Sequence, residues 1–217
     1  MADPGLFEIM FSTRSMRHLK PDPVPDEVIY KILDAGLRAP SGGNNQHWRF
    51  MVVKDPEVKR QIQKVYLKGW ADAQAMYRNR PAPEHLGDQK LRGILDAATH
   101  LAEHMAEAPV LLIACLKERT MPAAIAAKLG RLSGSSIYPA VQNILLSCRA
   151  HGLGATLTTV ASLYEEDLKP ILKLPDDVNT YALIPIGYPR GKFGPVQRMT
   201  VEEVTCVDQW GKAFTGK

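Results

Sequence analysis

An uninterrupted apolar run at residues 110–116 constrains the fold of this chain more than any other feature. The run reads Val-Leu-Leu-Ile-Ala-Cys-Leu, has the length of one strand and is introduced by Pro109. An apolar run that does not alternate with polar residues is typical of a strand that is covered on both faces. The sequence therefore predicts a sheet with helices on both sides, which is an α+β sandwich.

Helical and extended patterns alternate on both sides of this run. Apolar residues repeat at helical spacing after Asp26 and stop before Pro40, which predicts a helix over residues 26–38. Further helices are expected at 56–77, 91–106, 137–151 and 165–172, and further strands at 48–53, 155–159 and 181–187. The helix at 137–151 is apolar nearly all round, which is typical of a central helix. Residues 79–88 combine prolines, a glycine and polar residues, which predicts a loop.

The composition of the chain, and the motifs that it lacks, exclude several classes of protein. The net charge of +4, from 27 Lys and Arg against 23 Asp and Glu, is too mild to indicate a nucleic acid partner. The chain has three cysteines but no Cys-x-x-Cys pair, and it has no histidine cluster at ligand spacing. The sequence therefore predicts neither a disulfide framework nor a metal site. No Gly-x-Gly-x-x-Gly turn or P-loop is present. Without a long apolar window or a signal peptide pattern, a single cytoplasmic domain over residues 1–217 with no membrane partner is expected.

The first candidate site is Arg14-Ser15-Met16-Arg17, which places two guanidinium groups three residues apart around a hydroxyl. Such a set is able to hold a phosphate through bidentate and hydroxyl hydrogen bonds. The alternative interpretation is a solvated helix end, because Arg and Ser are common surface residues.

The second candidate is the loop between residues 39 and 48, which carries Ser41, Asn44 and Gln46 beside two glycines. Flexible backbone and carboxamide groups of this kind can approach a planar polar heterocycle. The same residues are equally typical of a helix end followed by a turn. His47 has no recognisable acid–base partner nearby in the sequence.

Two further clusters lie in the second half of the chain. Small residues and hydroxyls follow one another from Gly152 to Thr159, where a ligand can approach the backbone and Thr158 and Thr159 can donate hydrogen bonds. A glycine helix end that leads into a strand is the alternative. The last cluster is Ile186-Gly187-Tyr188-Pro189 with Arg198 beyond it.

In this order and at these separations, the four clusters resemble the nitroreductase family of FMN proteins. The family pattern has Arg-Ser-x-Arg, then Pro-Ser-x-x-Asn-x-Gln-Pro-Trp, a long helix that ends in Gly-Leu-Gly, Ile-Gly-Tyr-Pro and a late Arg. The resemblance extends from about Phe11 to Val204. It departs from the pattern at Thr13, where many relatives have a basic residue, and at His47, which replaces the usual Pro.

This resemblance implies a nitroreductase-like fold, with a mixed but mainly antiparallel central sheet in an intertwined homodimer. Arg14, Ser15, Arg17 and Arg198 would hold the FMN phosphate, ribityl chain and pyrimidine edge. Ser41, Asn44 and Gln46 would reach the flavin of the partner subunit, and Thr158 and Thr159 would lie near its N5. A variable lid or insertion is expected at about residues 64–91, and the tail 205–217 is expected to pack on the partner.

The activity implied is electron transfer from NADH or NADPH through FMN to a small flat electrophile, such as a nitroaromatic or a quinone, in a ping-pong mechanism. No catalytic side chain is then required, because the flavin supplies the difficult chemistry. Two alternatives stay open: a dehalogenating or flavin-cleaving relative, and a protein that stores or senses FMN without turnover. Lid residues for the first alternative are not recognisable between Lys64 and Leu91.

Overall fold

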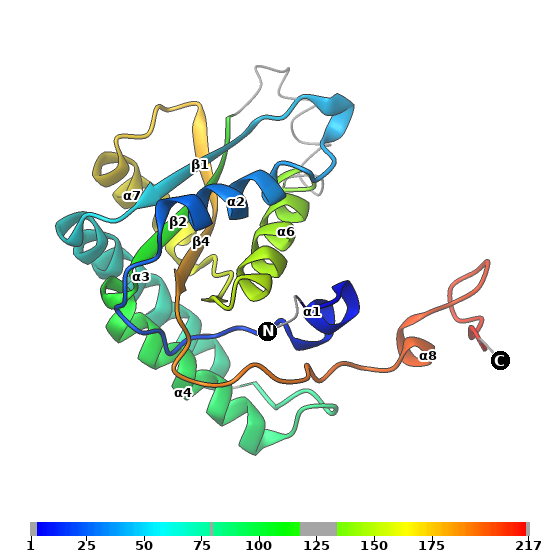
Figure 1. The fold of residues 1–217 in the computed structure, drawn as a ribbon. Helices are drawn as coiled ribbons and strands as arrows, with labels where there is room; N and C mark the ends of the chain where they lie inside the picture. The colour runs from blue at the N-terminus through cyan, green and yellow to red at the C-terminus, as the bar shows by residue number, and fades with distance from the viewer. Residues whose placement is uncertain (1–3, 79, 118–133, 216–217) are drawn as a thin grey trace.

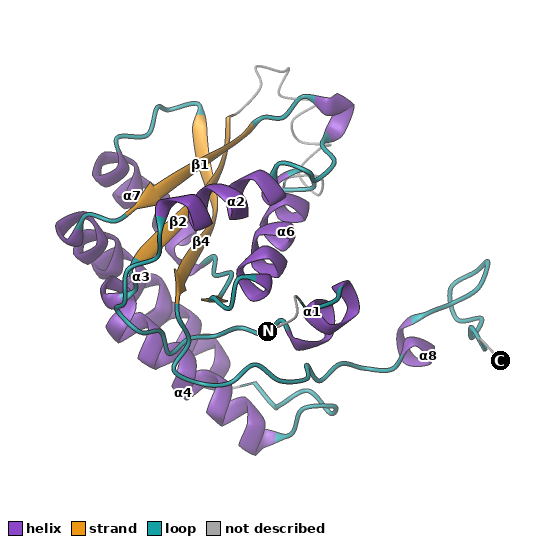
Figure 2. Ribbon diagram, in the orientation of Figure 1, coloured by secondary structure: helices purple, strands orange, loops and turns teal. Residues whose placement is uncertain are grey.

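A four-stranded sheet forms the centre of the molecule in the computed structural model, which describes residues 4–78, 80–117 and 134–215 (Figures 1 and 2). The strands are β1 (Trp48–Val53), β2 (Val110–Lys117), β3 (Gly154–Ala155) and β4 (Val178–Gly187), in the order β1-β2-β4-β3. Every pairing among these strands is antiparallel. The mainly antiparallel sheet expected above is confirmed, and no parallel pair occurs in the described part of the chain.

The apolar run of residues 110–116 is the central strand because its two faces belong to two different cores. Leu111 and Ile113 pack with α3 (Pro56–Arg78), α4 (Asp88–His104) and α7 (Glu165–Leu172). Leu112 and Ala114 pack on the opposite face with α2 (Asp26–Gly36) and α6 (Ile137–Ala150). Both faces of β2 are therefore shielded from water, which confirms the sandwich with helices on both sides (Figure 2).

Helix α6 is the central helix on the face of the sheet that it shares with α2. The side chains of Ile137, Val141, Ile144 and Cys148 are fully buried against the sheet and α2. Gly36 of α2 is what allows the close approach, because a Cβ there would lie 2.8 Å from Cγ1 of Ile144.

The strand expected over residues 155–159 is confirmed only at Ala155. Gly154 and Ala155 form β3 and pair with β4 in a ladder, and Thr158 forms an isolated bridge with Leu183 of β4. At Thr159 the backbone turns, with φ −123° and ψ −5°, into the 3-10 helix η4 (Val160–Tyr164). A β-branched, apolar composition predicted extended structure here, whereas packing of this segment under α3 imposes the turn.

Other differences concern the ends of elements. Helix α2 ends at Gly36 instead of residue 38, because Leu37 to Ala39 form a turn before Pro40. Helix α4 begins at Asp88, and β4 begins at Val178, each three residues earlier than expected. Among the described residues, the sequence patterns missed four short elements: α1 (Leu6–Ser12), η1 (Gly42–Asn44), η4 and α8 (Val201–Val204).

The N-terminal segment and the segment after β4 lie along the same end of the sheet. Met16 N donates to Ala155 O at 3.1 Å, and Lys20 N donates to Tyr188 O at 2.7 Å. A Cβ at Gly154 would lie 2.8 Å from Cβ of Met16, so the glycine permits this close packing. The chain then leaves the body through α8 and ends in an exposed tail (Figure 1).

None of the helices in the described residues has the length and apolar character needed to span a bilayer.

Candidate functional site

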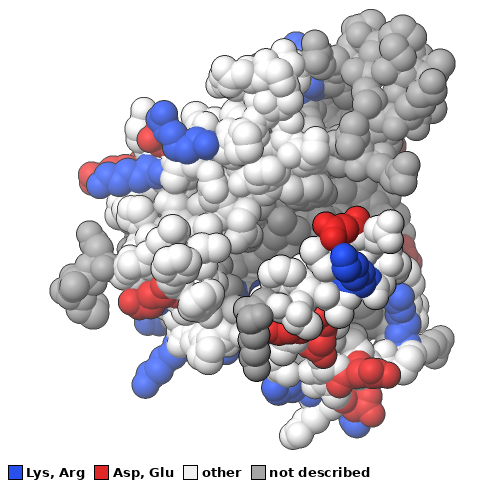
Figure 3. All heavy atoms as spheres, turned by 90° about the vertical axis from the view of Figure 1, so that its right-hand side faces the viewer, with Lys and Arg blue, Asp and Glu red and all other residues white. Residues whose placement is uncertain are grey.

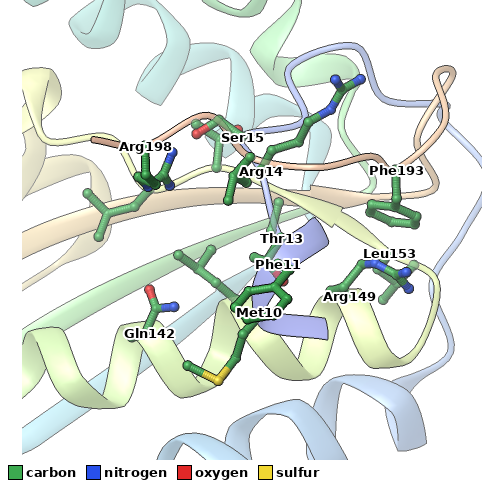
Figure 4. Close-up of a pocket in the computed structure, with 15 residues that line it drawn as sticks. Met10, Phe11, Thr13, Arg14, Ser15, Gln142, Arg149, Leu153, Phe193 and Arg198 are labelled. Carbon is green, nitrogen blue, oxygen red and sulfur yellow. The ribbon is translucent and has the colours of Figure 1, made fainter. Parts of the chain in front are cut away.

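Arg14, Ser15 and Arg198 line two neighbouring hollows at the end of the sheet. One is a pocket of about 400 Å³ next to α1 and α6, and the other is a groove of about 1020 Å³ next to α4. The two arginines come from opposite ends of the sequence. Both line the same hollows because the segment after β4 runs past the N-terminal segment, although their side chains point to different sides (Figure 4).

The walls of the 400 Å³ pocket combine apolar side chains with amide and hydroxyl groups. Met10 and Phe11 come from α1, and Gln142 and Leu145 come from α6. The third sequence cluster contributes Leu153, Ala155, Thr156 and Leu157. Figure 4 shows the side chains of Phe11, Gln142 and Arg198 around the same space.

Arg149 also lines this pocket, but its charge is engaged by neighbouring groups. Its Nε donates to Ser12 Oγ at 2.9 Å, and its Nη2 lies 3.4 Å from Glu8 Oε1. Its guanidinium carbon stands 4.4 Å from the ring centroid of Phe193, which is a cation–π contact. Arg149 therefore holds α1 and the segment after β4 against α6.

Arg14 and Arg198 differ from Arg149 because they bind only neutral groups. Arg14 Nη2 donates to Lys192 O at 3.0 Å, and Arg198 Nη1 donates to Gln197 O at 2.7 Å. Within residues 4–78, 80–117 and 134–215, neither forms an ion pair with a carboxylate.

Arg17 adds a third guanidinium, half-buried, beside the groove. Burial lowers the pKa of Arg17, and among the described residues no carboxylate is paired with it. A partly desolvated cation without an acid partner is costly unless an anion binds it. The three arginines and Ser15, which line the same groove, are therefore of the residue types that bind an anionic group.

Ser41, Asn44 and Gln46 lie in a different part of the molecule, around η1, and line none of the hollows described above. They bind one another: Gln46 N donates to Ser41 Oγ at 3.1 Å, and Gln46 Nε2 donates to Asn44 Oδ1 at 3.1 Å. Asn44 and Gln46 both have positive φ, 53° and 52°. A single chain does not bring these residues to the arginines, and their role toward a partner's flavin stays a prediction.

Thr158 and Thr159 also lie outside these hollows. The hydroxyl of Thr158 is 2.9 Å from the hydroxyl of Tyr66 on α3, and Thr159 is exposed at the start of η4. Thr156 and Leu157 of the same cluster reach the pocket instead. The assignment of Thr158 and Thr159 to the flavin N5 stays a prediction.

A model of the Nitroreductase family matches residues 10–188 of the sequence, which is most of the chain. The chain belongs to the Nitroreductase family. This agrees with the four clusters, which lie within the matched range except for Pro189 and Arg198.

Two curated relatives represent two kinds of nitroreductase-family protein. Iodotyrosine deiodinase 1 of Rattus norvegicus is 28% identical over 207 residues, which cover 94% of this chain and 70% of the rat protein. The NADH dehydrogenase of Thermus thermophilus is 32% identical over 196 residues, which cover 88% and 90% of the two chains. The chain spans 61% of the human iodotyrosine deiodinase 1.

The nitroreductase fold is also found in a solved structure of oxidised iodotyrosine deiodinase bound to FMN and 3-iodo-L-tyrosine. The TM-score is 0.69 at 25% identity, and the match covers 91% of this chain and 96% of the other.

Sequence reasoning missed several residues of the pocket, and for one of them a signal was present. Arg149 is a lone cation in an otherwise apolar helix, a pattern that indicates a partner at that position. Met10, Phe11 and Gln142 gave no signal, because α1 is short and Gln142 resembles a solvated helix residue. Cys148 is a core residue because its side chain is fully buried, and this burial raises the pKa of its thiol to about 12.

Proposed function

We propose that this chain binds FMN at Arg14, Ser15, Arg17 and Arg198, and that it transfers electrons from NADH or NADPH to small flat acceptors such as nitroaromatics or quinones. The observation that carries the proposal is the set of three guanidinium groups without acid partners around Ser15. The family match and the relative named NADH dehydrogenase support it.

The residues around the pocket fit the chemistry of FMN. Unpaired guanidinium groups and the Ser15 hydroxyl suit a phosphate and ribityl hydroxyls. The apolar walls from Met10, Phe11 and Leu145 suit an aromatic ring system, and Gln142 offers an amide to a ring edge. The volume of about 400 Å³ falls within the range of about 300–1,000 Å³ that is usual for small-molecule sites.

When bound, FMN supplies the redox chemistry, in which a hydride is accepted from a nicotinamide and electrons are passed to an acceptor. The side chains then have to bind FMN, orient it and tune how easily it is reduced. Arg17 is a partly buried cation, so its field stabilises negative charge close to it more strongly than an exposed arginine would. None of these roles requires a side chain that gains or loses a proton.

The proposal includes a homodimer in which Ser41, Asn44 and Gln46 complete the partner's site. It is supported by exposed apolar surface, which a stable monomer rarely carries in quantity. Leu6, Phe7 and Phe11 of α1 are 64%, 68% and 65% exposed, and Trp210 of the tail is 98% exposed. Figure 3, which views the side of the molecule with α1 and the tail, shows a broad central area without charged side chains.

The test of this function is cofactor analysis followed by steady-state kinetics. We expect about one FMN per chain after reconstitution, because one chain carries one set of three arginines. Double-reciprocal plots with NADPH or NADH and a quinone should be parallel, because donor and acceptor use one flavin in turn. Absence of flavin after reconstitution, or flavin that no nicotinamide bleaches, contradicts the proposal.

Reductive dehalogenation is the second candidate, favoured by the deiodinase relative that aligns with 94% of the chain. It is tested by incubating the FMN-loaded protein with 3-iodo-L-tyrosine and dithionite and measuring iodide. If the protein turns over 3-iodo-L-tyrosine and both NADH and NADPH reduce its flavin only slowly, reductive dehalogenation would replace the NAD(P)H oxidoreductase proposal.

A further inference from the structure

The 1020 Å³ groove beside α4 is lined by basic residues from three separate segments. Arg14, Arg17 and His18 come from the N-terminal segment, His85 and Lys90 come from the start of α4 and the residues before it, and Arg198 comes from the segment after β4. No acidic residue lines the groove within the described parts of the chain. A concave surface with one sign of charge concentrates ligands of the opposite sign.

Two side-chain contacts hold the opposite walls of the groove together. Lys90 Nζ donates to Gln197 Oε1, and Gln197 Nε2 donates to His85 O at 2.8 Å. The segment that carries Arg198 is thereby tied to the segment that carries His85 and Lys90. Since Gln197 is neutral, the contact positions the Lys90 ammonium without cancelling its charge.

His85 and Lys90 are not used by the proposed FMN site, which takes Arg14, Ser15, Arg17 and Arg198. They also lie outside the four sequence clusters. Beyond Lys90, the wall of the groove continues along α4 through Gly93, Ile94 and Ala97. These side chains are small or apolar, so a planar ring or a sugar can lie against the helix there.

We propose that this groove binds the phosphate groups of the nicotinamide electron donor, and that Lys90 and His85 contact them. The inference rests on the proposed function, in which a nicotinamide dinucleotide approaches the same end of the sheet. Two sources of phosphate are compatible with the groove: the diphosphate of both dinucleotides, and the additional 2′-phosphate of NADPH.

The test compares Lys90→Gln with Arg92→Gln. Arg92 is the matched control, because it lies on the same helix, carries the same charge and is exposed, but does not line the groove. Flavin reduction is followed by stopped flow with NADPH and with NADH. Binding of NADP⁺ to the oxidised protein is measured by calorimetry, which requires no turnover.

Lys90→Gln is expected to weaken donor binding by about tenfold, since a charge-assisted phosphate contact is lost, while reduction at saturating donor and FMN affinity are unchanged. Arg92→Gln should show the wild-type affinity, and Lys90→Arg should retain most of it. An effect on NADPH alone identifies the 2′-phosphate as the contact, and equal effects on both donors identify the diphosphate.

Equal donor affinities in Lys90→Gln and Arg92→Gln would overturn the inference. A loss of FMN affinity in Lys90→Gln would also overturn it, because this would assign the groove to the cofactor. The inference would fail as well if Lys90→Gln changed only the reaction with anionic electron acceptors. If the protein holds no FMN, the proposed function fails separately. Calorimetry still tests the inference about the groove in that case. If NADP⁺ binds and Lys90→Gln weakens this binding, the inference is supported; if NADP⁺ does not bind, it is overturned.

Discussion

The hydroxyl of Tyr66 lies 2.9 Å from the hydroxyl of Thr158 and joins α3 to the edge of β4. Tyr66 is 3% exposed, and burial raises the pKa of its phenol. The backbone of Thr158 is fixed as well, because it exchanges hydrogen bonds of 3.0 and 2.8 Å with Leu183. The contact therefore pairs two partly buried hydroxyls, and it directs the Thr158 side chain toward α3.

Replacing Tyr66 by Phe should lower the free energy of unfolding by about 1–2 kcal/mol, because the Thr158 hydroxyl is left without a partner. The measurement is urea denaturation of Tyr66→Phe, Thr158→Val and the double variant. Since both single changes break one contact, the double variant should lose less than the sum of the two losses. Simple additivity would show that the contact contributes nothing to stability.

Arg198→Ala should weaken FMN binding by about tenfold or more, because a charge-assisted hydrogen bond to phosphate contributes about 1.5–3 kcal/mol. Fluorescence titration of the apoprotein measures the affinity, and circular dichroism verifies the fold. Arg92→Ala serves as the control for a general change in surface charge. A folded Arg198→Ala protein with wild-type affinity would remove Arg198 from the site.

Two helix glycines are expected to respond oppositely to alanine. A Cβ at Gly69 in α3 would overlap the carbonyl oxygen of Val160, whereas a Cβ at Gly93 in α4 meets nothing within 4 Å. Gly69→Ala should therefore destabilise the fold by about 1–3 kcal/mol. Gly93→Ala should stabilise it by about 0.4–1 kcal/mol, through higher helix propensity and lower unfolded-state entropy. Thermal denaturation distinguishes the two; equal shifts would contradict the close approach of α3 and η4.

Three stacked histidines should make stability depend on pH. The ring of His100 lies 3.9 Å from that of His18 and 4.3 Å from that of His104, between centroids. Burial, followed by the charges of His18 and His104, lowers the pKa of His100 below its ordinary value of 6.5, while Glu107 and Glu103 oppose the shift. Arg17 and Arg190 line the adjoining cavity.

Because its folded pKa is lowered, His100 costs no stability above pH 6.5. As the pH falls below this value, the unfolded chain binds a proton that the folded chain does not, so stability declines until the folded pKa is reached. His100→Phe keeps a flat ring and should reduce this decline. Urea denaturation at about pH 7.5 and about pH 5.5 measures it; an unchanged difference between the two pH values would contradict the assignment, and exposed His151→Gln is the control.

The proposed homodimer predicts that subunit separation and cofactor release occur together, because Ser41, Asn44 and Gln46 of one subunit would complete the site of the other. Light scattering with simultaneous flavin absorbance during dilution is the measurement. A 24.0 kDa monomer that keeps its full complement of FMN would contradict the shared site. Trp210→Ser, at an exposed tail position, should raise the concentration at which the dimer dissociates.

The sequence by itself determined the layers of the fold. The apolar run of residues 110–116 predicted a strand buried on both faces, and helical spacing located α2, α3, α6 and α7. Such patterns are informative because burial of an element depends on the spacing of its own apolar residues. The proposal of a phosphate site at Arg14-Ser15-Met16-Arg17 could be made from the sequence for a similar reason, since all its groups are close in the chain.

Only the tertiary structure decided which segments meet. It brought Arg14 and Arg198 to the walls of one pocket, added Gln142 and Phe11 to that pocket, and turned Thr158 toward Tyr66. These contacts join segments far apart in the chain, and they depend on how whole surfaces pack, including the close approach allowed by Gly154. Local periodicity carries no information about such packing, so it extended the strand that ends at Ala155 to Thr159, directly before η4, and left the groove around Lys90 unseen.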